Sequence, residues 1–117
     1  METGLFMQHW DLLTISAPEG TRDPIVLHSD EGARAVLIVL QPGQSLGDHQ
    51  VKENAWVTVL EGTVEISAGE ESIQGGAGTM VRFEPDERHA LRSEAGARIL
   101  MILAPWPGAG HYRGSAV

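Results

Sequence analysis

The 117-residue sequence contains no cysteine, and this absence excludes several kinds of site. Without thiols there can be no disulfide scaffold, no zinc ribbon and no cysteine nucleophile. Long apolar runs are also missing, because the longest, Ile99 to Pro105, is far shorter than the roughly 20 residues of a membrane-spanning helix. Glu2 stands where a secretory signal would carry basic residues. We therefore expect a cytoplasmic protein with no membrane partner.

Basic residues are scarce as well, since 8 Lys and Arg face 16 Asp and Glu, for a formal net charge of −8. Nucleic acids and anionic membranes attract basic surfaces, so neither is an expected partner. The hydrophobic share of 42% and the charged share of 21% are typical of a globular chain and not of an acidic disordered one. At this length a second hydrophobic core would not fit. We expect residues 1–117 to form a single domain.

Turn-forming residues are abundant, with 14 glycines and 6 prolines, and helical spacing of apolar residues is largely absent. Instead, short apolar or alternating segments follow one another between turn signals. We predict strands at 34–40, 55–60, 63–67, 72–74, 79–83, 89–93 and 97–103. Glu61-Gly62 is interpreted as a tight hairpin turn. This rhythm predicts an all-β sandwich or barrel with its core at about 34–103, on which the N-terminal segment and C-terminal tail pack.

Three residues in this core keep the spacing of a known motif. Gly43 is followed after five residues by His49, and the segment closes at Gly62 after the run Val-Leu-Glu. This pattern resembles the first motif of the cupin family, G-x5-H-x-H-x3,4-E-x6-G. The second cupin motif, G-x5-P-x-G-x2-H-x3-N, is matched more loosely by Gly78, Pro85, His89 and Ser93. The resemblance implies a double-stranded β-helix, also called a jelly-roll barrel.

The sequence departs from the family at its metal ligands. In cupins two histidines, a glutamate and a third histidine bind a divalent metal inside the barrel. Here Val51 stands at the second histidine and Ala55 at the glutamate, so only His49 and His89 are retained. The second motif departs further, because its inner glycine is Glu87, the spacing before the histidine is one residue short, and its asparagine is Ser93. Two histidines fall short of the three protein ligands of most catalytic metal sites.

Glu53 is the candidate third ligand. It lies four residues from His49, too far to share an ion along an extended strand. A chain reversal at residues 52–54 would aim its carboxylate inward and complete a set of two histidines and a carboxylate. The other interpretation is a solvated turn residue. The metal in such a site could be zinc, manganese, iron or nickel.

Two classes of function follow. In the first, the protein is a binding module with a degenerate metal site, and its barrel cavity takes a small molecule. We expect this pocket to be lined by His49, Val51, Ala55, Val57, Val59, His89 and Leu91. In the second, it is an enzyme. Either His49, His89 and a third ligand such as Glu53 hold a metal, as the resemblance to cupin dioxygenases and isomerases implies, or a histidine acts as a metal-free general base.

The aromatic residues indicate a partner. Trp10, Trp56 and Trp106 are more large rings than a small barrel can readily enclose, and Trp56 has the opposite parity from the cavity residues. Aromatic residues are enriched at interfaces, so we expect a homodimer. The remaining histidines, His9, His28 and His111, belong to neither motif and are interpreted as surface or packing residues.

Overall fold

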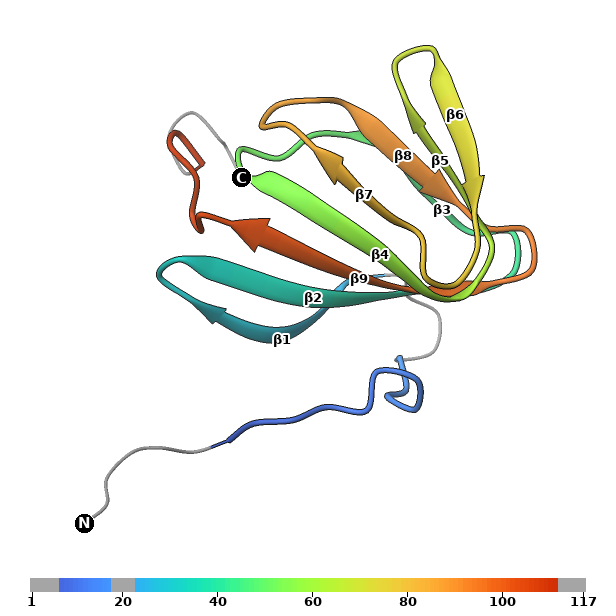
Figure 1. Ribbon diagram of the computed structural model, residues 1–117, viewed down its shortest axis with the longest axis horizontal. Coiled ribbons are helices and arrows are strands. Elements are labelled where there is room, and N and C mark those ends of the chain that lie inside the picture. The colour runs from blue at the N-terminus through green and yellow to red at the C-terminus, as the bar shows by residue number, and fades with distance from the viewer. Residues whose placement is uncertain (1–6, 18–22, 112–117) are drawn as a thin grey trace.

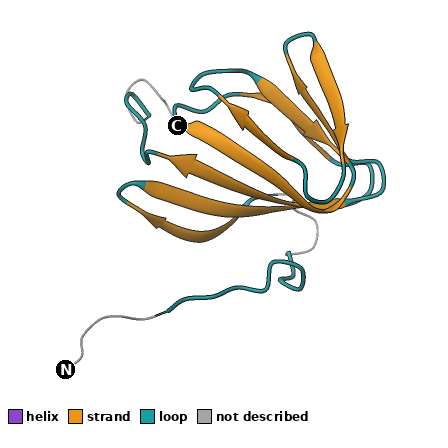
Figure 2. Cartoon of the chain, viewed as in Figure 1, coloured by secondary structure: helices purple, strands orange, loops and turns teal. Residues whose placement is uncertain are grey.

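The computed structural model describes residues 7–17 and 23–111, and Figure 1 shows its nine strands. They are β1 (Ile25–Asp30), β2 (Ala33–Leu40), β3 (Ser45–His49), β4 (Asn54–Gly62), β5 (Val64–Ala68), β6 (Glu71–Gly75), β7 (Met80–Phe83), β8 (His89–Arg92) and β9 (Ala97–Ala104). The described residues contain strands and loops but no helix, as Figure 2 shows. Accordingly, no helix that could cross a membrane is found in these ranges. The outer ends of the expected domain, 1–6 and 112–117, lie outside the described residues.

The strands form two sheets that face each other. One has five strands in the order β1-β2-β9-β4-β7, and the other has four in the order β3-β8-β5-β6. Neighbouring strands pair antiparallel throughout both sheets. In Figure 1 the sheets converge at one end and spread apart toward the other, where the tail follows β9. This arrangement confirms the predicted all-β double-stranded β-helix.

Every strand predicted from the sequence is present, but β1 and β3 were not expected. β3 contains Gly47 and Asp48, residue types that are depleted in strands. It is held in place by antiparallel pairing with β8, and β1 is held by pairing with β2. Both strands therefore form because they pair with a neighbouring strand, and not because of their local sequence preference.

The predicted hairpin at Glu61-Gly62 is wrong in one respect. A short connection is present, but β4 belongs to the five-stranded sheet and β5 to the four-stranded sheet, so the connection carries the chain from one sheet to the other. Gly62 has a φ of 86°, a conformation that residues with a side chain rarely adopt. A Cβ atom here would press against the carbonyl oxygen of Gly96. This corner therefore requires glycine.

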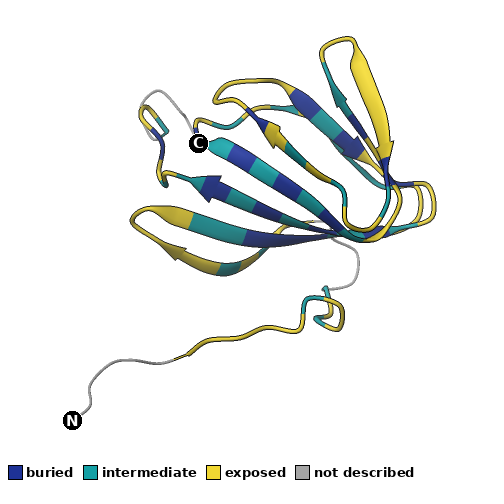
Figure 3. Cartoon of the chain, viewed as in Figure 1, coloured by how far each residue is buried: buried dark blue, intermediate teal, exposed yellow. Residues whose placement is uncertain are grey.

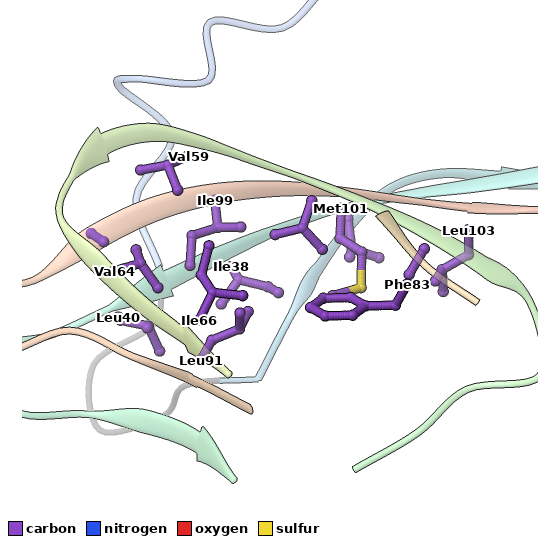
Figure 4. Packing of buried hydrophobic residues seen from close by; sticks show 14 residues of the cluster. Ile38, Leu40, Val59, Val64, Ile66, Phe83, Leu91, Ile99, Met101 and Leu103 are labelled. Atoms are coloured by element: carbon purple, nitrogen blue, oxygen red, sulfur yellow. The ribbon is translucent and has the colours of Figure 1, made fainter. Parts of the chain in front are cut away.

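The core lies between the sheets and follows from period-two alternation. On β4, Ala55, Val57 and Val59 are buried, while Trp56 points to the outer face as predicted. Figure 3 shows the same alternation of buried and partly exposed residues along β9. In Figure 4 the side chains of Ile99 and Leu91, which come from opposite sheets, meet in one apolar cluster. Burying an aliphatic side chain of this size stabilises a fold by about 1.5–3 kcal/mol.

The N-terminal segment and the tail both contact this framework. The Nη1 of Arg98, on β9, donates to the carbonyl oxygen of Leu12 at 2.9 Å. After β9 the tail returns to the β1–β2 turn, where Trp106 and Gly32 exchange two backbone hydrogen bonds of 3.1 and 2.9 Å. These bonds hold the backbone of Trp106 against the β1–β2 turn.

Candidate functional site

The two histidines retained from the motifs come together in the structure. β3 and β8 are neighbours, and His49 and His89 are partners in their register. The ring centroids are 4.4 Å apart, and the rings meet edge to face. Both Nδ1 atoms are used locally, since His49 donates to the Gly47 carbonyl at 2.7 Å and His89 to the Glu87 carbonyl at 3.0 Å. What each ring can bind therefore depends on its Nε2 atom.

His89 is the more buried of the two, with 1% of its surface exposed. Its ring stacks on Phe83 with centroids 4.1 Å apart. Burial lowers the pKa of His89 below its usual 6.5, because the charged imidazolium loses its hydration, and the hydrogen bond to Glu87 opposes this in part. Its Nε2 finds no hydrogen-bond partner among the described residues. His89 is thus a neutral, buried imidazole with one unused nitrogen.

The pair does not fit a tight metal centre. Across residues 7–17 and 23–111, no group of three His, Cys, Asp or Glu side chains is placed to hold an ion. Val51 and Ala55, at the other two ligand positions of the motif, carry no donor atoms. A divalent ion on two imidazoles alone would lack the third protein ligand of a stable site.

Glu53 takes neither of the roles considered from the sequence. It is fully buried, so it is not a solvated turn residue, and it does not join His49 and His89. Its Oε2 accepts a 2.8 Å hydrogen bond from the Gly108 N–H and lies 2.6 Å from His111 Nδ1. The chain does turn inward before β4, but it aims the carboxylate at the C-terminal tail.

The tail is shaped to receive this carboxylate. A Cβ atom on Gly108 would collide with the carbonyl oxygen of Lys52, so only glycine allows the tail to approach so closely. The His111 ring packs edge to face on Trp106 with centroids 4.4 Å apart. His111, interpreted from the sequence as a surface or packing residue, is therefore half-buried and paired with Glu53. The sequence holds no signal for this pair, because its members lie far apart in the chain and His111 belongs to neither motif.

A hollow of about 330 Å³ opens between β1, β2, β3, β9 and the tail. Most of its wall is apolar, and the guanidinium of Arg34 lies 4.5 Å from the centre of the Trp106 ring. Its lining residues are Pro24, Val26, Arg34, Val36, Ile38, Leu46, His49, Val51, Met101, Leu103, Trp106 and His111. His49 and Val51, two of the residues predicted for a ligand pocket, are among those that line this hollow.

The other predicted lining residues are elsewhere. Ala55, Val57, Val59 and Leu91 are at most 1% exposed and pack in the core, because the two sheets close on each other at these positions. His89 does not line the hollow; it is among the residues that line a separate surface depression with Asp48 and Arg88, while its ring stays buried against Phe83. The cavity is therefore displaced from the centre of the barrel toward β1, β2 and the tail, and its residues Arg34, Trp106 and His111 were not predicted.

Comparison with known proteins agrees with this architecture. A family model described as "Cupin domain" matches residues 36–103. An RmlC-like cupin from Desulfovibrio desulfuricans superposes with a TM-score of 0.77 at 22% identity, over 86% of this chain and 98% of that one. A Thermus thermophilus protein gives 0.75 at 26% identity, over 85% and 98%. A protein of unknown function from Streptococcus pyogenes gives 0.73 at 21% identity, over 85% and 88%. No curated protein matches the sequence.

Proposed function

Because the chain belongs to the cupin family, we propose that it is a small-molecule binding cupin whose family metal site is degenerate. The ligand site is the hollow between β1, β2, β3, β9 and the tail. A cytoplasmic location, expected from the sequence, is part of this proposal. So is the absence of nucleic-acid and membrane partners, which the acidic charge supports.

The character of the hollow carries the proposal. At about 330 Å³ it is large enough for a small molecule, and its walls are mainly aliphatic and aromatic. A few polar groups, Arg34, His49 and His111, converge on this apolar space. Apolar walls supply affinity and a small number of placed polar groups supply orientation, which is the usual composition of ligand pockets.

One observation favours an alternative, a metal-dependent enzyme of the dioxygenase or isomerase type. The buried Nε2 of His89 is unsatisfied within the described ranges, and an unsatisfied buried polar atom is costly unless something binds it. His49 would be the second ligand. Glu53 is not placed to be the third, because its carboxylate lies against Gly108 and His111 of the tail and does not join the two histidines.

The test is fluorescence titration with N-phenyl-1-naphthylamine, a neutral apolar dye that brightens in apolar sites. We expect saturable binding that Val26→Trp weakens at least tenfold, because Val26 lines the hollow, is 46% exposed and has room to carry a ring that would fill part of it. Ile73→Trp is the matched control, since Ile73 is 48% exposed on β6 and away from the hollow. Binding equal in both variants would contradict the proposal.

The same titration distinguishes the proposed binding function from the metal-dependent enzyme. We expect the dye to bind equally in EDTA and with added zinc, manganese, iron or nickel, and the melting temperature to stay unchanged on metal addition. Uptake of one metal per chain that raises the melting temperature, and that His89→Ala abolishes, would instead favour the metal-dependent enzyme. A ligand that binds only the folded state must stabilise it, so the melting temperature is a direct readout.

We also propose that the chain forms a homodimer through the outer face of the five-stranded sheet. Trp56 and Ile102 are partners on this face, and Met80 is 63% exposed on the neighbouring strand β7. Trp10 is exposed in the N-terminal segment, whereas Trp106 lines the hollow. The tryptophans outside the core and the hollow are therefore Trp10 and Trp56. Exposed apolar patches of this kind are typical of protein interfaces.

Light scattering should give a mass twice the 12.6 kDa of one chain. Met80→Asp is expected to shift the protein to the monomer mass, because it places a charge in the apolar contact. Ile73→Asp, at an exposed apolar position of the other sheet, should leave the dimer intact. A monomer mass for the unaltered protein would show that this face has no second copy on it.

A further inference from the structure

We infer that the ligand of the hollow is an apolar molecule with one carboxylate, held at the Trp106 end by Arg34 and His111. This inference rests on the proposed function, because it names the class of ligand for the same site. The two groups that hold the carboxylate come from β2 and from the tail. Neither of them belongs to the two metal-binding motifs.

The charge of the lining is opposite to that of the protein. The chain carries a formal charge of −8, yet the ionisable residues that line the hollow are Arg34, His49 and His111, with no Asp or Glu among the lining residues described. An acidic protein that presents only basic groups to a cavity selects against cations and in favour of anions. The apolar remainder of the wall suits a ligand whose charge is confined to one end.

Both anion-binding groups lie beside one ring. The Arg34 guanidinium is 4.5 Å from the Trp106 ring centre, and the His111 ring centroid is 4.4 Å from it. Arg34 has no ion pair with any other residue in the described part of the chain. A guanidinium presents parallel N–H donors that match the two oxygens of a carboxylate. Stacking on Trp106 restricts how this fork can turn.

Glu53 is a positioning residue for His111. Its buried Oε2 lies 2.6 Å from Nδ1, so that side of the ring is fixed against the carboxylate while the ring forms part of the hollow's wall. The Glu53 contact thereby places the imidazole in the wall of the hollow, beside the Trp106 ring. The Gly108 N–H bond to the same oxygen holds Glu53 in this orientation.

Dye displacement with three matched probes tests the inference. Benzoate, benzyl alcohol and benzylamine share an apolar ring and differ in the charge of one group. We expect benzoate to displace N-phenyl-1-naphthylamine at a concentration at least tenfold lower than benzyl alcohol, and benzylamine to be the weakest of the three. Acetate, which has the charge without the ring, should displace no dye over the same range.

Two variants test whether Arg34 causes the preference for benzoate. Arg34→Met keeps a long apolar side chain and removes the charge, so it should weaken benzoate at least tenfold and leave benzyl alcohol within twofold. Arg92→Met is the control, because Arg92 is an exposed arginine of β8 that pairs with Glu94 at 3.7 Å and lies outside the hollow. It should change neither probe.

The outcomes separate this inference from the proposed function. Benzoate that is no better than benzyl alcohol, or that fails to displace the dye, overturns the carboxylate inference while the dye itself still reports a binding site. Benzoate preference that survives Arg34→Met also overturns it. A dye that does not bind, or that binds equally after Val26→Trp, contradicts the proposed function.

Discussion

Gly62→Ala is expected to lower the free energy of unfolding by about 3 to 5 kcal/mol, measured by urea denaturation. Two costs add at this position. The φ of 86° is strained for any residue with a Cβ atom, and that Cβ would be forced against the backbone carbonyl of Gly96. A backbone atom cannot move aside as a flexible side chain can, so the corner between β4 and β5 must shift. The free energy of unfolding of a domain is only about 5–15 kcal/mol, so this substitution would remove much of the protein's stability.

Gly43→Ala is the matched control for this prediction. Gly43 has nearly the same φ, 83°, but an added Cβ would meet no atom within 4 Å. It should therefore show the backbone strain alone, about 1–2 kcal/mol. Equal effects of the two substitutions would mean that the close approach of Gly62 to Gly96 contributes nothing.

Glu53→Ala should lower the free energy of unfolding by about 2 to 4 kcal/mol and release the tail. The substitution removes the acceptor of the Gly108 N–H and the carboxylate beside His111, and it leaves a void in a fully buried position. As the tail loosens, the Trp106 ring should become more hydrated. We therefore expect a red shift of tryptophan fluorescence and weaker binding of N-phenyl-1-naphthylamine, together with the loss of stability.

Glu61→Ala provides the comparison. Glu61 also pairs with a basic residue, Arg98 at 3.5 Å, but it is exposed, and exposed ion pairs contribute about 0–1 kcal/mol. It should leave the fluorescence spectrum and dye binding unchanged. A Glu53→Ala protein as stable as Glu61→Ala, with an unshifted spectrum, would show that the buried carboxylate does not hold the tail.

The sequence predicts most of the fold because the core strands repeat a local pattern. β4 and β9 alternate buried and partly exposed residues over their whole lengths, and this alternation is visible in the sequence. β1 and β3 carry no such pattern, since most of their residues are exposed or only partly buried. Their position depends on pairing with β2 and β8 at the edges of the sheets, and local sequence patterns do not reveal such pairing.

The site was predicted less completely, for two physical reasons. The contact of His49 with His89 follows from motif spacing, and the structure brings the two rings together. The position of the hollow instead depends on how closely the sheets approach, and they leave no space at Val57. The Glu53–His111 pair joins a turn to a Gly- and Pro-rich tail, and no periodicity links such segments.

Nuclear Overhauser effects between bound N-phenyl-1-naphthylamine and the protein test most directly whether the hollow is the ligand site. Protons of the dye should give cross-peaks to the Trp106 ring, to the methyl groups of Val36 and to the methyl group of Met101, which all line the hollow. These cross-peaks should disappear in Val26→Trp. Cross-peaks confined to Met80 or Ile73, exposed apolar residues outside the hollow, would contradict the proposed site.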